Sequence, residues 1–101
     1  MSDKVYFTTS RNATSETVSF AKELAKNLTN SEFLHRSQKP IEKIIEEARY
    51  KGFKFLGILE EENNKISFLK IIEITETDWH DHKKIPFSKD VISAIEQMGL
   101  E

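Results

Sequence analysis

A polar loop at residues 8–12 directly follows the first apolar stretch and precedes residues with helical spacing. Backbone N–H groups and hydroxyls before a helix N-terminus can bind a phosphate, and Arg11 adds a charged group that can donate two hydrogen bonds. The pattern predicts an anion site without a catalytic base. Residues of these types also turn a chain and cap a helix, and this second interpretation stays open. The loop residues are Thr8, Thr9, Ser10, Arg11 and Asn12.

The distribution of charge favours the same part of the chain. The formal net charge of -2 counts against a nucleic-acid binder, because phosphates are contacted chiefly by clustered Lys and Arg. Residues 1–39 nevertheless carry six Lys/Arg against four Asp/Glu, whereas residues 40–101 carry nine against thirteen. An anionic partner is therefore expected at the N-terminal part. Four cationic residues there extend the predicted binding surface, although each alone reads as an ordinary solvated side chain: Lys22, Lys26, Arg36 and Lys39.

Other chemistry-bearing residues carry weaker predictions. His80, Asp81 and His82 are possible metal-ligand types, but the chain has no cysteine and no further histidine nearby, so no metal site and no cofactor is expected. His35 is interpreted as a structural or surface histidine, because proton transfer needs an orienting partner. The acidic run at residues 60–62 is interpreted as a solvated turn.

The spacing of apolar residues predicts a mixed α/β sheet with the order β-α-β-α-β-β-α. Strands are expected at residues 5–7, 33–35, 53–59 and 66–74, and helices at residues 14–28, 40–51 and 88–98. Pro40 suits the start of the second helix and Gly52 its end. Residues 75–86 are expected to be a polar connection. The helices are expected chiefly on one face of the sheet, because their apolar residues need a common surface to cover: Val18, Leu24, Ile41, Ile44 and Ile45.

The length of the chain suits one domain, residues 1–101, with a modest core. Its longest apolar runs are too short to span a membrane, and the N-terminal residues lack the charged and apolar regions of a signal peptide. The sequence therefore predicts a cytoplasmic protein without a membrane partner.

Several segments together resemble one family, the Brix domain in its archaeal form. Residues 7–12 read FTTSRN, residues 17–24 read TVSFAKEL, and residues 41–48 read IEKIIEEA. The family pattern has a strand, a Thr-Thr-Ser-Arg loop and a helix that contains Ser-Phe-Ala-Lys-Asp/Glu-Leu. The resemblance continues through residues 30–33 and Arg36, covers residues 1–74, and leaves residues 75–101 as the connection and C-terminal helix.

The resemblance implies a fold similar to the anticodon-binding domain of certain aminoacyl-tRNA synthetases. It also implies a non-catalytic RNA-binding factor in ribosome biogenesis, with ribosomal RNA or its precursor and ribosome-assembly proteins as partners. A Brix domain normally contains two similar halves, whereas this chain is shorter. A partner or a second copy of the chain, as a homodimer, is therefore expected to supply the other half.

Two other functions stay open beside RNA binding. The acidic C-terminal part and the shorter length also suit a protein-interaction module in a ribonucleoprotein assembly, without direct contact to RNA. An enzyme of another class would need a nucleophile–base pair, a metal cluster or a Gly-rich phosphate loop. With Gly52, Gly57 and Gly99 as its three glycines, the chain offers no such loop, so it is not expected to be an enzyme.

Overall fold

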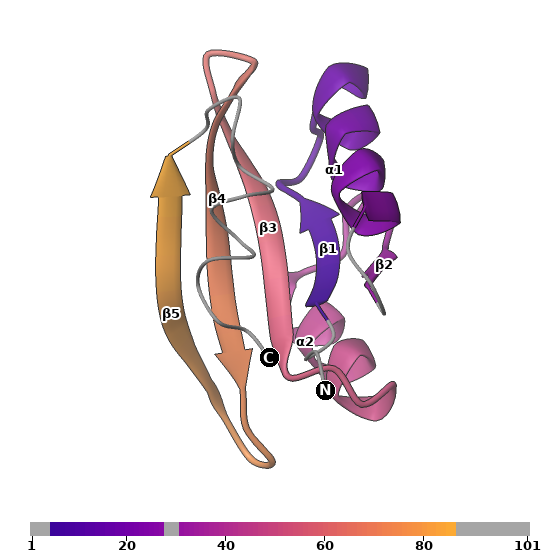
Figure 1. The fold of residues 1–101 in the computed structure, drawn as a ribbon, viewed down its shortest axis with the longest axis vertical. Helices are drawn as coiled ribbons and strands as arrows, with labels where there is room; N and C mark the ends of the chain where they lie inside the picture. The colour runs from indigo at the N-terminus through magenta and orange to yellow at the C-terminus, as the bar shows by residue number, and fades with distance from the viewer. Residues whose placement is uncertain (1–4, 28–30, 87–101) are drawn as a thin grey trace.

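A computed structural model describes residues 5–27 and 31–86, which form five strands and two helices (Figure 1). All five strands belong to one sheet in the order β2-β1-β3-β4-β5. β1 runs parallel to β2 and β3, and the neighbours β3–β4 and β4–β5 are antiparallel. This confirms the predicted mixed α/β sheet. The elements are β1 (Val5–Thr9), α1 (Ser15–Asn27), β2 (Glu32–Phe33), α2 (Ile41–Tyr50), β3 (Phe55–Glu62), β4 (Lys65–Ile74) and β5 (Trp79–Pro86).

The two helices cover opposite faces of the sheet, so the prediction of one covered face was wrong. Leu24 of α1 packs in the same cluster as Phe7, whereas Ile44 of α2 packs in the cluster of Tyr6 and Leu56. Tyr6 and Phe7 are consecutive strand residues, whose side chains point to opposite faces. The crossover from β1 through α1 to β2 moves across the sheet in one direction, and the crossover from β2 through α2 to β3 moves in the other. Crossover connections between parallel strands are right-handed, so the two helices lie on opposite faces.

Residues 75–86 were predicted as a connection, but Trp79–Pro86 is the edge strand β5. Its side chains are mostly exposed, with Ile85 the buried one and Trp79 half-buried, so it lacks the alternation by which strands are recognised. Edge strands tolerate such composition, and charged residues, proline and a bulge protect them from pairing with other chains. β5 contains the charged residues Lys83 and Lys84 and ends in Pro86. Its pairing with β4 has the bulge, seen as a shift in register between Ile71 and Ile72. The helix predicted at residues 88–98 lies outside the described residues.

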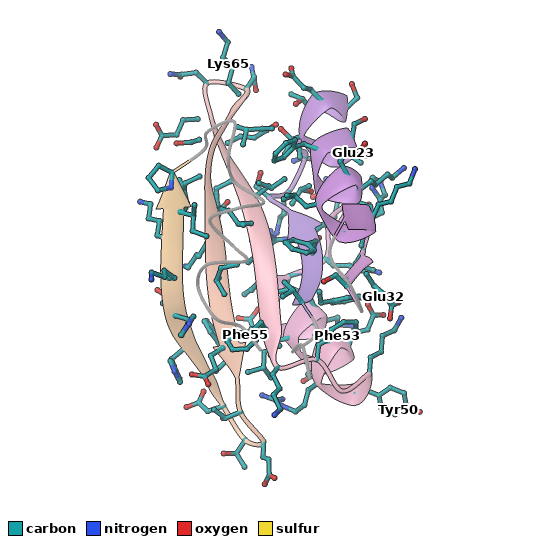
Figure 2. All side chains as sticks on the ribbon, viewed as in Figure 1. Glu23, Glu32, Tyr50, Phe53, Phe55 and Lys65 are labelled. Atoms are coloured by element: carbon teal, nitrogen blue, oxygen red, sulfur yellow. The ribbon has the colours of Figure 1, made fainter. Side chains whose placement is uncertain are left out.

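The ends of β3 and β4 are joined by a two-residue turn, which is tighter than the predicted turn at residues 60–64. Asn63 and Asn64 have positive φ values of 52° and 63°, as a hairpin turn that matches the strand twist requires. Both strands therefore continue almost to the tip, where Figure 2 shows Lys65. Glu61 thereby belongs to a strand rather than to a solvated turn.

The end of α2 confirms the role that was predicted for Gly52. Gly52 has a φ of 88°, and its N–H donates to the carbonyl of Arg49 over 3.0 Å. The N–H of Phe53 donates to the carbonyl of Ala48 over 2.9 Å, which completes a Schellman motif. Neither of the two described helices has the length and apolar character that crossing a membrane would require.

Gly57 lies where β3 passes the core side chain of Phe7, and Gly57→Ala is expected to lower the free energy of unfolding by about 1.5 kcal/mol. A Cβ at this position would lie 2.9 Å from two ring atoms of Phe7, which is fully buried and cannot move without disturbing the core. Urea denaturation measures the change. Ser19→Ala, on the exposed side of α1, is the control and should stay within about 0.5 kcal/mol of wild type. Equal stability of Gly57→Ala and wild type would contradict this packing.

Candidate nucleic-acid interface

The candidate site lies at the carboxyl ends of the parallel strands β1 and β2. Because α1 and α2 leave these neighbouring strands toward opposite faces, the chain opens a crevice between their loops, the usual position of a binding site in such sheets. Hydrogen bonds hold the two strand ends together. The N–H of Leu34 donates to the carbonyl of Phe7 over 2.8 Å, and Thr8 Oγ1 donates to the carbonyl of Leu34 over 2.9 Å.

Arg36 is buried between the two loops and joins them. It is 9% exposed, and its Nη1 donates to the carbonyl of Thr9 while its Nε donates to the carbonyl of Lys39, each over 3.1 Å. Burial and, secondarily, the positive charge of Arg11 lower the pKa of Arg36, against the opposite effect of nearby carboxylates. Arg36 was predicted as an RNA contact, and the structure places it as a buried residue whose hydrogen bonds position both loops.

The loop after β1 divides into buried and exposed residues. Thr8 and Thr9 are buried, and Thr9 Oγ1 donates to the carbonyl of Ser10 over 3.0 Å, so both threonines build the loop. Ser10 is half-buried, and Arg11 and Asn12 are exposed. Of the five residues predicted here, the last two therefore offer accessible side chains to a ligand.

The predicted lysines are spread over a wider surface. Lys39 is exposed in the loop between β2 and α2, next to the site. Lys22 and Lys26 are exposed on α1, roughly 10 and 16 Å along the helix axis from Ser15. The Nζ of Lys22 lies 5.8 Å from the ring centroid of Phe33, which places it toward the β2 edge. The structure places Arg11, Arg36 and Lys39 in the two loops, but it places Lys22 and Lys26 farther along α1.

The N-terminus of α1 already holds a carboxylate. Glu61 Oε2 accepts hydrogen bonds from Thr14 N–H over 3.0 Å, from Thr14 Oγ1 over 2.8 Å, and from Thr17 Oγ1. Burial opposes ionisation of Glu61, but the hydrogen bonds from Thr17 and Thr14 outweigh it, so the pKa of this carboxyl lies below its ordinary value. A phosphate at this helix end would meet a negative charge. The anion contact that the sequence predicted there therefore falls to Arg11.

A pocket of about 230 Å³ lies between the two loops. The Nε2 of Gln38 donates to Oδ1 of Asn12 and so joins its two sides. Asn12 and Ser37 have positive φ values of 56° and 54°, which favour Asn and are unusual for Ser. The sequence did not assign Val18, Ser37 or Gln38 to a site, and it indicated a structural or surface role for His35, whose side chain is exposed. The residues that line the pocket include Ser10, Asn12, Val18, His35, Ser37 and Gln38.

A second hollow, of about 360 Å³, lies over β3, β4 and β5. Two of its three lysines already have partners within the chain. Lys70 Nζ lies 3.4 Å from Asp81 Oδ1, and Lys84 Nζ lies 4.0 Å from the ring centroid of Phe68. This hollow is therefore a weaker place for an anion than the pocket beside Arg11.

The histidines of β5 contact different partners. His80 Nε2 lies 2.8 Å from Glu73 Oε1, and the ring of His82 lies 5.4 Å from that of Phe55 between centroids. Asp81 pairs with a lysine instead. In residues 5–27 and 31–86, no three His, Cys, Asp or Glu side chains are grouped so that they could hold a metal ion.

Two solved structures have a fold similar to that of this chain. A probable ribosomal biogenesis protein from Aeropyrum pernix K1 superposes with a TM-score of 0.71 at 17% identity, over 80% of this chain. Mil, an archaeal Imp4-like protein, superposes with a TM-score of 0.69 at 19% identity, over 83% of this chain. The chain shares the fold of both. This agrees with the fold that the sequence resemblance implied, whereas neither a protein-family model nor a curated protein sequence matches the chain.

The chain spans about half the length of these two proteins. The matched region covers 44% of the Aeropyrum pernix protein and 49% of Mil.

Proposed function

We propose that this chain is a non-catalytic RNA-binding factor in ribosome assembly, which acts in the cytoplasm on ribosomal RNA or its precursor. One observation carries the proposal: Arg11 is exposed in the loop after β1, and buried Arg36 donates to the carbonyl of Thr9, two residues before Arg11, as well as to that of Lys39 in the second loop. The fold supports the assembly role, since one structural neighbour is described as a probable ribosomal biogenesis protein and the other as Imp4-like.

The two arginines favour an anion for an electrostatic reason. Arg36 is held in place by backbone carbonyls, so its positive charge cannot move away from Arg11. A phosphate beside Arg11 would reduce the repulsion between the guanidinium groups and accept two hydrogen bonds from Arg11.

Arg11→Ala is expected to weaken binding to a structured ribosomal RNA fragment about tenfold, which corresponds to about 1.4 kcal/mol. Loss of one phosphate contact should also make the dependence of log affinity on log salt shallower by roughly one unit. Fluorescence anisotropy at several salt concentrations measures both quantities. Lys83→Ala removes an equal charge from β5 and should change neither by a comparable amount.

Unchanged affinity and slope in a folded Arg11→Ala variant would contradict the proposal. The second candidate function is then a protein-interaction module, which the half-length match to the structural neighbours favours. Its partner would be a ribosome-assembly protein or a second copy of this chain. Analytical ultracentrifugation detects the second copy as a homodimer.

A further inference from the structure

We propose that the pocket between the two loops binds one unpaired base of the RNA, with the adjoining phosphate at Arg11. This inference rests on the proposed function and assigns its ligand: RNA with a bulged or looped-out nucleotide rather than a continuous duplex. Unstacked bases in loops and bulges are the parts of RNA that proteins recognise by stacking and by hydrogen bonds to base edges.

The size of the pocket limits what it can hold. At about 230 Å³ it is smaller than the roughly 300–1,000 Å³ of pockets for drug-sized ligands. One flat base fits such a space, whereas a base pair or a folded peptide segment does not. The crevice is open to the surface through its exposed residues His35 and Gln38, so a base can enter while it remains attached to an RNA chain.

The polar groups at the rim match the edge of a base. Gln38 Nε2 donates to Asn12 Oδ1, which directs the Nδ2 group of Asn12 and the Oε1 atom of Gln38 to other partners. An amide donor and an amide acceptor then lie on adjoining side chains, as the donors and acceptors along a base edge require. His35 supplies an aromatic ring and Val18 an apolar wall for the flat face of the base.

The pocket is formed before any ligand binds. Ser37 keeps a left-handed backbone conformation that serine seldom adopts, and such outliers cluster at binding sites because the surrounding structure must hold them. The hydrogen bonds of Arg36 to both loops provide that support. A preformed pocket lowers the cost of ordering the site when a ligand binds.

The position of Arg11 favours RNA over a free nucleotide. Arg11 lies between the pocket residues Ser10 and Asn12 in the chain, and it is exposed outside the pocket itself. A phosphate contact there suits the backbone of a strand whose base enters the crevice. The buried charge of Arg36 lies beneath the same loop and strengthens the attraction.

The test compares three RNA hairpins of equal length: one with a single bulged nucleotide, one with an abasic bulge, and one fully paired. Wild type is expected to bind the intact bulge about tenfold more tightly than the other two. His35→Ala should remove most of this preference, since stacking on one aromatic side chain contributes an effect of this order. Gln38→Ala should reduce it severalfold, and His80→Ala on β5, an exposed histidine outside the pocket, should leave it unchanged.

Equal affinity for the intact and abasic bulges, or a preference that His35→Ala and Gln38→Ala leave intact, overturns the base pocket while the proposed RNA binding stands. Failure to bind any of the three hairpins or the ribosomal RNA fragment contradicts the proposed function itself. Competition by micromolar mononucleotide would show a small-molecule site and also overturn the inference. Matching melting temperatures show that the variants are folded.

Discussion

Arg36→Met is expected to lower the free energy of unfolding by about 3 kcal/mol. The substitution removes two charge-assisted hydrogen bonds, to the carbonyls of Thr9 and Lys39, and each such bond contributes about 1.5–3 kcal/mol. Methionine has a long apolar side chain, so it keeps much of the packing and avoids the cost of burying a charge. This gain offsets part of the loss, but the two carbonyls lose their partner.

Urea denaturation followed by circular dichroism measures this loss for Arg36→Met. Lys39→Met is the matched control, because Lys39 lies in the same loop and its side chain is exposed. The control should remain within about 0.5 kcal/mol of wild type. Arg36→Lys should be intermediate, because lysine restores the charge but not the planar fork that reaches both loops. Wild-type stability of Arg36→Met would show that Arg36 does not join the loops.

Glu61→Gln is expected to lower the free energy of unfolding by about 2 kcal/mol. Its carboxylate accepts hydrogen bonds from Thr14 and Thr17 at the N-terminus of α1, where a cap contributes about 0.5–2 kcal/mol and charge adds to it. Glutamine keeps the shape and one acceptor oxygen but loses the charge. Glu62→Gln, one residue further along the exposed hairpin, should change stability little.

The pH dependence of stability provides a separate test of Glu61. The pKa of Glu61 is lower in the folded than in the unfolded chain. The stabilisation by its ionised carboxylate is therefore fully present above the pKa of the unfolded chain, which is about 4.3 for glutamate. This stabilisation is lost as the pH falls through the pKa of the folded chain. Wild type and Glu61→Gln should therefore differ most above this value and converge in acid. A difference in stability between the two proteins that grows as the pH falls would contradict a lowered pKa for Glu61.

The local elements of the fold were predictable, but their arrangement was less so. The helical spacing before Asn27, the glycine after α2 and the paired asparagines of the hairpin each reflect short-range chemistry. The two faces covered by the helices depend on the order of strands in the sheet, which periodicity does not encode. β5 was missed because a charged edge strand needs little apolar alternation.

The site was predictable to the level of one loop. The composition of residues 8–12 identified the place, but not which of its side chains are exposed. Burial of Arg36 depends on its contact with Thr9, which is 27 positions away in the sequence. Capping of α1 depends on the contact of Glu61 with Thr17, which is 44 positions away. The pocket likewise depends on Asn12 and Gln38, which meet only when β1 and β2 pair.

We infer that this chain contacts ribosomal RNA at the crevice between its two loops. Ultraviolet crosslinking in cells, followed by sequencing of the bound RNA and mass spectrometry of the crosslinked peptides, identifies both the RNA that is bound and the residues that contact it. We expect ribosomal RNA or its precursor, crosslinked to peptides that contain Arg11 and Asn12 or His35 and Gln38. Crosslinks confined to β5, or recovery of no ribosomal RNA above an uncrosslinked control, would contradict it.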